Sequence, residues 1–177
     1  MRRAVLFLFL IPLLAVGQEP AKKPDVWSPF KYFLGNWQGE GKGEAGVSQL
    51  EREYQSILNG KYIQIKHKSV YAPQEKKPKG ETHEEIGFIS FARGPKAFMM
   101  RQFHVEGFVI QYKAETVSED GKLMVFTSET IENIPAGWRA RETYRIVSEN
   151  EFTETFELAE PGKDFHIYTT NHFKRKK

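Results

Sequence analysis

The chain has 177 residues, with 26 Lys and Arg against 23 Asp and Glu, and it contains no cysteine. This length favours a single domain. The lack of cysteine excludes disulfides, thiolate metal sites and cysteine nucleophiles, so a buried core has to stabilise the fold. The formal net charge of +3 is too small for the strong basic bias that is typical of nucleic-acid-binding proteins.

Residues 1–17 have the layout of a secretory signal peptide. A basic start, Met1-Arg2-Arg3, precedes an apolar run over 4–16, and Ala15-Val16-Gly17 places small residues at a cleavage site. The run is shorter than the roughly 20 residues that span a bilayer, although an uncleaved anchor is the alternative. We therefore expect cleavage after Gly17 and export to the periplasm or the medium. The remaining residues, 18–177, would carry a net charge of +1.

A short helix is predicted at the start of the domain, which we place at 28–177. Residues 18–27 are polar, include two prolines and are predicted to form a flexible leader. Ser28 suits the N-cap, Pro29 suits the first helical position, and Gly35 lies just beyond the expected end.

After this helix the apolar residues alternate with a period of two. Turn signals such as Asn59-Gly60 and Asp120-Gly121 separate the alternating runs. The predicted strands cover residues 36–44, 47–57, 61–72, 81–92, 96–105, 107–117, 122–131, 138–147, 151–159 and 164–175. The pattern predicts an all-β fold, namely an up-and-down antiparallel barrel of about ten strands with one short N-terminal helix. A β-sandwich is the alternative.

The alternation also predicts which side chains face the lumen. The inward faces combine aromatic residues with single polar or ionisable ones, and in the run at 96–105 the two faces are not distinguishable. The candidate ligand-binding residues are His67, Arg101, Gln102, His104, Phe108, Tyr112, Trp138, Glu142, Glu154 and Phe156. Buried carboxylates need partners. Those expected for Glu142 and Glu154 are Arg52, Arg101, His67, His104 or a ligand, and a purely structural network is the alternative.

The stretch Leu34-Gly35-Asn36-Trp37 after a short helix resembles the opening of the calycin superfamily, which contains lipocalins and fatty-acid-binding proteins. Those folds place a Gly-x-Trp on the first strand and a basic residue late on the last strand. The resemblance implies a structural pair in which Lys174 or Arg175 lies over the Trp37 ring.

Two stretches are similar to nitrobindins, the heme-binding barrels related to fatty-acid-binding proteins. They are GNWQGEG at 35–41 and HEEIGFI at 83–89. The resemblance implies heme as a possible cofactor. Nitrobindins hold the iron through a His on the last strand, and counting back from the basic ending places that position closer to Tyr168 than to His166. These two candidates are two residues apart and are expected to face one ligand, and Tyr also ligates heme iron.

Other chemistry-bearing patterns are weak. Gly39, Gly41 and Gly43 alternate along a predicted strand, so they indicate close packing or a bend and not a phosphate-binding loop. The five histidines are not spaced like zinc ligands, and we expect no protein-only metal site.

These patterns favour an exported protein that binds a small molecule or lipid, one that is mostly apolar with a polar or acidic group. Heme is the named candidate, and no nucleic-acid partner is expected. One alternative is an isomerase or lyase in the lumen, either heme-dependent or using Glu142, Glu154 and His104 as acid and base. Another is an interaction module of the cell envelope whose lumen is filled by its own side chains.

Overall fold

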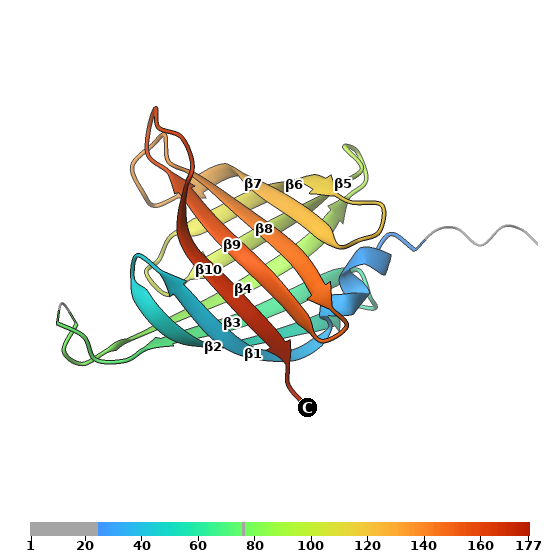
Figure 1. The fold of residues 1–177 in the computed structure, drawn as a ribbon. Helices are drawn as coiled ribbons and strands as arrows, with labels where there is room; N and C mark the ends of the chain where they lie inside the picture. Colours follow the sequence, from blue (N-terminus) through green and yellow to red (C-terminus); the bar gives the residue numbers. More distant parts are fainter. Residues whose placement is uncertain (1–24, 76) are drawn as a thin grey trace, which may run out of the picture.

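A computed structural model describes residues 25–75 and 77–177 (Figure 1). The predicted signal peptide and most of the leader lie outside these residues. Among the residues that are described, no helix has the length and apolar character needed to cross a membrane.

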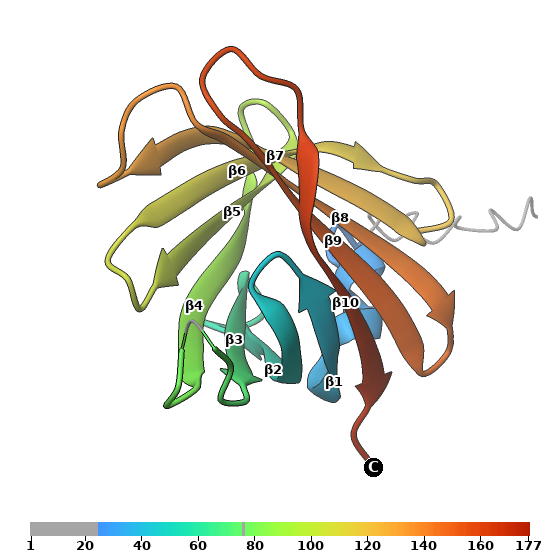
Figure 2. The ribbon, with the colours of Figure 1, turned by 60° about the vertical axis from the view of Figure 1, so that its left-hand side comes forward.

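Ten antiparallel strands close into one barrel (Figures 1 and 2). The strands are β1 Gly35–Gly43, β2 Gly46–Ile57, β3 Tyr62–Tyr71, β4 Glu81–Ala92, β5 Ala97–His104, β6 Val109–Val117, β7 Leu123–Glu132, β8 Arg139–Ser148, β9 Glu151–Ala159 and β10 His166–Arg175. Each strand pairs with the next along the chain, and β10 returns to pair with β1. The predicted up-and-down barrel is confirmed, with every strand end within two residues of its predicted position. The sandwich alternative is wrong.

Glycines on β1 allow the last strand to close against the first. A Cβ atom on Gly39 would lie 1.9 Å from the carbonyl oxygen of His172, and one on Gly43 would lie 2.1 Å from that of Tyr168. No side chain fits at such distances. These glycines therefore serve close packing at the β1–β10 seam, which agrees with the expectation from the sequence.

The N-terminal helix, η1 Ser28–Phe33, is a 3-10 helix that lies at one end of the barrel (Figure 1). Its N-cap is Trp27, so the prediction of Ser28 as the cap is wrong. The turn begins earlier because Asp25 accepts hydrogen bonds from the backbone N–H groups of Trp27 and Ser28, each at 3.0 Å. The helix buries Phe30 and Phe33 against the interior.

Arg175 forms the structural pair with Trp37. The two residues are register partners across β1 and β10, and the guanidinium carbon lies 4.1 Å from the centre of the Trp37 ring. Arg175 also donates hydrogen bonds to the carbonyl oxygens of Tyr32 and Leu34, at 2.6 and 2.9 Å. Lys174 was the other candidate and is wrong, because it points outward and pairs with Glu151 at 3.1 Å.

Aromatic side chains fill the half of the barrel next to η1. They are Phe30, Phe33, Trp37, Tyr54, Phe98, Phe126, Tyr144, Phe152 and Phe173. Phe152 lies in the middle of this cluster, with its ring centre 4.8 Å from that of Trp37 and 4.7 Å from that of Phe173. We call this half the closed half.

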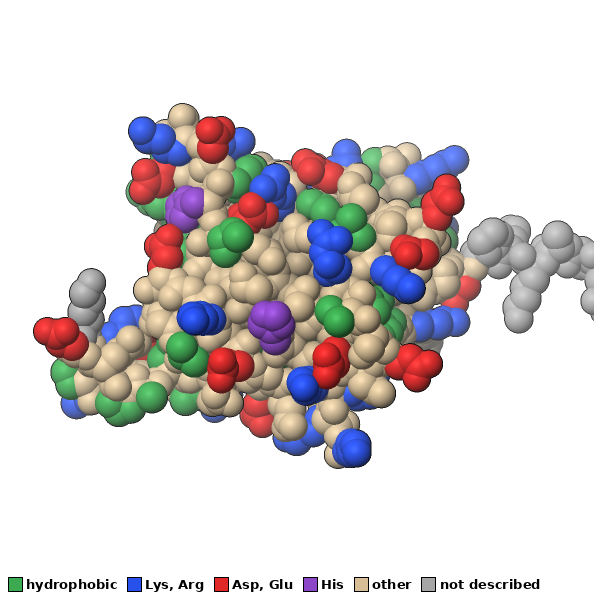
Figure 3. Space-filling view, in the orientation of Figure 1, with side chains coloured by type: hydrophobic (Ala, Val, Ile, Leu, Met, Phe, Trp, Pro, Cys, Tyr) green, Lys and Arg blue, Asp and Glu red, His purple; other side chains and the backbone are tan. Residues whose placement is uncertain are grey.

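The outer face seen in Figure 3 carries cationic and anionic side chains interspersed. An exposed ion pair joins the C-terminal Lys176 to Glu51 on β2, at 3.4 Å. Such exposed pairs each contribute little to stability, about 0–1 kcal/mol. The polar side chains that bear on function are therefore those directed inward.

Candidate functional site: the polar lumen

The other half of the barrel, which we call the open half, encloses a cavity of about 540 Å³. This volume lies within the range of ligand pockets, about 300–1,000 Å³. Its apolar wall consists of Phe108, Ile110, Ile131, Ile134, Pro135, Trp138, Phe156 and Leu158. The lumen is only partly filled by its own side chains, which speaks against the filled-lumen alternative.

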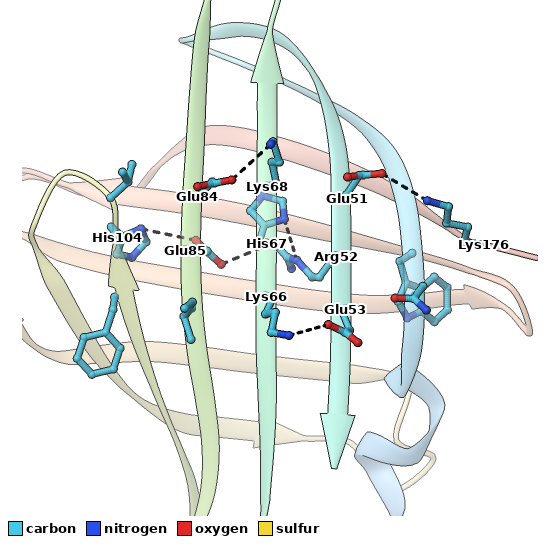
Figure 4. Close-up of a pocket in the computed structure, with 15 residues that line it drawn as sticks. Glu51, Arg52, Glu53, Lys66, His67, Lys68, Glu84, Glu85, His104 and Lys176 are labelled. Carbon is cyan, nitrogen blue, oxygen red and sulfur yellow. Dashed lines mark hydrogen bonds and ion pairs between the residues drawn. The ribbon is translucent and has the colours of Figure 1, made fainter. Parts of the chain in front are cut away.

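A row of four polar side chains crosses the opposite wall on neighbouring strands (Figure 4). In register order they are Arg52 on β2, His67 on β3, Glu85 on β4 and His104 on β5. Directly opposite residues of antiparallel strands face the same side of a sheet, so the register alone brings these four groups together. Lys68 and Glu84, one position away on β3 and β4, pair on the outer surface instead.

Arg52 forms the floor of the cavity. Its guanidinium makes a buried ion pair with Glu154 and lies 4.7 Å above the Phe173 ring of the closed half. Its Nε donates to Nδ1 of His67 at 3.1 Å. Asn171 donates to the same Glu154 carboxylate at 3.0 Å. The expected partner for Glu154 is therefore Arg52, one of the candidates from the sequence.

His67 is a neutral structural residue. Burial, followed by the adjacent charge of Arg52, lowers its pKa to about 3. Both ring nitrogens have partners, because Nδ1 accepts from Arg52 and Nε2 lies 2.8 Å from the hydroxyl of Ser69. No nitrogen of this ring is left to bind a ligand.

Glu142 lines the cavity as a neutral acid near pH 7. Burial, reinforced by the negative charges of Glu154 and Glu85, raises the pKa of its carboxyl to about 8. The hydroxyl of Tyr144 donates a hydrogen bond to it. A protonated carboxyl can itself donate a hydrogen bond, so Glu142 offers a donor to a ligand with an anionic group.

Most of the predicted lumen residues do surround the cavity. His67, His104, Phe108, Trp138, Glu142, Glu154 and Phe156 line it, while Gln102 and Tyr112 are buried in the interior beside it. Arg101 is the exception, because it lies on the outer face and contacts Glu132 at 2.7 Å. Its neighbour Gln102 points inward, and alternation along β5 places the two on opposite faces.

Several lining residues were not predicted as site residues. The polar ones among them include Ser69, His83, Glu85 and Asn171, as well as Arg52, which was named only as a possible ion-pair partner. Two of them, His83 and Glu85, lie in the stretch at 83–89 that carries the nitrobindin resemblance. Alternation did not mark them, because Ile86 and Phe88 share the parity of Glu84, and Ile86 is 46% exposed in the structure.

The two candidate iron ligands on β10 lie in different environments. Tyr168 lines the cavity, with its ring centre 5.9 Å from that of Phe156. His166 is exposed and lies 3.4 Å from Glu44, away from the cavity. A register shift between Ile167 and Thr169 interrupts the pairing there. The expectation that both side chains face one ligand is therefore wrong, because the bulge breaks the alternation.

A family model and one solved structure agree with this architecture. The family model described as "THAP4-like, heme-binding beta-barrel domain" matches residues 26–175. The crystal structure of Rv2717c from M. tuberculosis superimposes with a TM-score of 0.67 at 16% identity, covering 87% of this chain and 99% of that one. A de novo designed fluorescence-activating β-barrel gives a TM-score of 0.43 at 15% identity, covering 82% of this chain and 95% of the designed one.

No curated protein matches the chain. At 16% identity the likeness to Rv2717c establishes the fold alone, a closed antiparallel β-barrel. The family model covers nearly the whole described chain. A barrel with an internal cavity in such a family is a ligand-binding barrel, and the chain belongs to the THAP4-like, heme-binding β-barrel family.

Proposed function

We propose that this protein is an exported heme-binding barrel and that Tyr168 is the residue that ligates the iron. The supporting observation is that Tyr168 lines the cavity from the last strand, where the family resemblance expects the ligand, whereas His166 does not. Phenolate is an established axial ligand of heme iron.

The cavity fits this group in size and polarity. Its wall of aliphatic and aromatic residues, including Ile110, Ile131 and Leu158, would contact the macrocycle. Lys77 also lines the cavity and offers a cation for a carboxylate of the ligand, beside its ion pair with Glu81. Glu142 adds a neutral hydrogen-bond donor. Bound heme would supply iron chemistry inside the lumen.

Ligation by Tyr168 requires the loss of its phenolic proton. Burial raises the pKa of this group, and the nearby charge of Lys77 acts in the opposite direction. Because a bound ferric ion stabilises the phenolate far more strongly than one lysine does, the proton would leave on binding. Heme binding should therefore release protons and strengthen as the pH rises.

The test is a titration of residues 18–177 with hemin, followed by ultraviolet–visible absorption. We expect a saturable Soret band at one equivalent. Tyr168→Phe keeps the ring and its packing against Phe156 and removes only the hydroxyl, so the band should be lost or shifted. His166→Ala is the matched control on the same strand and should leave the spectrum unchanged.

Two outcomes contradict the proposal. A flat titration of the folded protein would exclude heme, and native mass spectrometry against lipids and other small acids would then identify the ligand. A Soret band that survives Tyr168→Phe but disappears in His166→Ala or His104→Ala would show that a histidine, and not Tyr168, ligates the iron.

Export rests on the layout of residues 1–17. Expression of the whole chain should give a shorter product in the periplasm or medium, with Gln18 as its first residue. Edman sequencing of that product checks the cleavage position. A full-length product that stays with the membrane fraction would support the uncleaved anchor instead.

A further inference from the structure

Three side chains with metal-binding atoms meet at the cavity wall between β4 and β5. His83 and Glu85 are two residues apart on β4 and point to the same face. His104 is the register partner of Glu85 on β5. Strand pairing therefore brings together two imidazoles and one carboxylate that the linear sequence separates by up to 21 positions.

The three facing atoms form a nearly equilateral triangle. Nε2 of His83 lies 3.8 Å from Oε2 of Glu85, Nδ1 of His104 lies 3.6 Å from the same oxygen, and the two nitrogens are 3.4 Å apart. A point equidistant from these atoms lies about 2.1 Å from each, which is the bond length of Zn²⁺ to nitrogen or oxygen.

These separations suit a shared metal ion better than hydrogen bonds. Strong hydrogen bonds between such groups are about 2.7–3.2 Å long, and the neighbouring contacts reach that range. Nδ1 of His83 is 2.7 Å from Glu106, for example. All three distances inside the triangle are longer, and one proton cannot bridge three acceptors at once.

Neighbouring groups orient two of the three ligands. Glu106 holds Nδ1 of His83, which leaves Nε2 directed at the triangle. Nε2 of Gln102 lies 3.4 Å from Oε1 of Glu85, the carboxylate oxygen that does not belong to the triangle. Carboxylate–histidine–metal arrangements of this kind fix the ring and raise its basicity.

Outside the triangle, the His104 ring is positioned by packing. Its ring stacks on Phe108 with centres 4.1 Å apart, and its side chain is only 6% exposed. Nε2 is buried with no hydrogen-bond partner among the described residues, so the only polar neighbours of this ring are His83 and Glu85. A buried imidazole whose sole polar contacts are two other ligand groups points to a site built for an ion.

The position also provides access and charge balance. All three residues line the cavity, so an ion can enter from the lumen and keep open coordination positions for a ligand. The carboxylates of Glu85 and Glu106 together match the charge of a divalent cation.

We propose that His83, Glu85 and His104 form a binding site for a divalent first-row transition metal such as Zn²⁺, Co²⁺ or Fe²⁺. Two imidazoles and one carboxylate are the donor set of catalytic zinc sites and of non-heme iron sites. Ca²⁺ and Mg²⁺ favour oxygen ligands and are not expected to bind. The site does not use Tyr168, although both line the same cavity. A bound ion would supply metal-activated water or an open coordination position for a ligand in the lumen.

The test uses heme-free protein of residues 18–177 and Co²⁺ as the probe. We expect visible d–d absorption bands that saturate at one Co²⁺ per chain and that Zn²⁺ abolishes in competition. Mg²⁺ in excess should leave the bands unchanged. Calorimetry with Zn²⁺ should give the same stoichiometry.

Variants assign the ligands. His83→Ala and His104→Ala should each weaken Zn²⁺ binding by about 100-fold or more, and Glu106→Gln, which changes a positioning residue, by about 10–100-fold. His172→Ala is the control on the outer face of β10, and Tyr168→Phe is the control for heme. Both should bind Zn²⁺ like the unaltered protein. Thermal unfolding of each variant without metal verifies that it is folded.

The proposal is overturned if folded protein gives no saturable Co²⁺ signal. It is also overturned if His83→Ala and His104→Ala bind Zn²⁺ as tightly as the unaltered protein, since the ion would then be adventitious. Because no heme is present, a failure here does not affect the Tyr168 proposal, and a failed hemin titration does not affect this site.

Discussion

The two halves of the barrel are built from the same ten strands but are stabilised in different ways. In the closed half, inward positions carry aromatic rings such as Phe152 and Phe173, which stack 4.7 Å apart. In the open half, the same strands place carboxylates, histidines and one arginine inward around a cavity. Arg52 lies between the halves, over Phe173 on one side and against Glu154 on the other.

This difference separates stability from function. Burial of apolar area stabilises the closed half by about 25 cal/mol per Å². Desolvation of the charges in the open half opposes folding unless each charge keeps its partner. The closed half can therefore support a polar, partly empty half that would not be stable alone. Substitution of matched residues in the two halves tests this division.

The largest expected effect is that of Arg52→Met. The substitution leaves Glu154 and Glu85 buried without their cation, and removal of one partner of a buried ion pair costs about 3–5 kcal/mol. The free energy of unfolding in urea should fall by that amount.

Arg101→Met is the matched control, because Arg101 makes an ion pair of similar chemistry with Glu132 on the outer face. Its effect should stay below about 1 kcal/mol. Similar losses for both variants would show that the buried network is not a special source of stability.

Phe152→Ala and Phe156→Ala compare the halves directly, since both residues lie on β9 and face inward. Phe152 is 1% exposed within the aromatic cluster, and its truncation should cost about 3–5 kcal/mol. Phe156 already borders the cavity, so its truncation should cost only about 1–2 kcal/mol. Urea unfolding measures both, and equal costs would contradict a division into two halves.

The sequence predicted the fold well because a meander is a local pattern. Each strand alternates with period two and ends at a turn signal, so the strand ends agree with prediction. Closure was inferred from the number of meandering strands, and the glycines on β1 were expected only to allow close packing or a bend. The predicted Ser28 cap failed because capping depended on Asp25, a residue outside the helix pattern.

The site was predicted only in part. Alternation placed Glu142, Glu154 and Phe156 inside correctly, because it needs only the parity of one strand. The row from Arg52 to His104 depends on the register between strands, which no single run encodes. Tyr168 and His166 were separated by a bulge, and nothing in the local pattern marks that bulge.

Glu142→Gln should make stability less dependent on pH. The pKa of this group is raised to about 8 in the folded protein from its ordinary value of 4.5, so the folded state holds a proton that the unfolded state loses between these values. The stability that Glu142 contributes is therefore complete below pH 4.5 and is lost as the pH rises to 8. We expect the free energy of unfolding of Glu142→Gln to rise by about 3–4 kcal/mol relative to that of the unaltered protein between about pH 5 and about pH 8.

The difference in free energy of unfolding between Glu142→Gln and the unaltered protein reports on the Glu142 carboxyl alone. Other titrating or charged groups face Glu142, namely Tyr144 on its own strand, Tyr112 on β6, Glu154 on β9, Glu85 on β4 and Arg52 on β2, and they are common to both. Urea unfolding of both proteins at several pH values measures this difference in the free energy of unfolding. A constant difference for Glu142→Gln would mean that the carboxyl is ionised throughout.

The smallest expected effects distinguish the two basic residues at the end of β10. Arg175→Ala removes two hydrogen bonds to backbone carbonyls and the contact with the Trp37 ring, and it should cost about 1.5–3 kcal/mol. Lys174→Ala removes only an exposed pair with Glu151 and should change stability by less than about 0.5 kcal/mol. Urea unfolding compares the two, with tryptophan fluorescence as the readout, since Trp37 reports on the closed half. If Lys174→Ala cost as much as Arg175→Ala, the outer surface would contribute to closure of the barrel, and the stability of the closed half would not come from its interior alone.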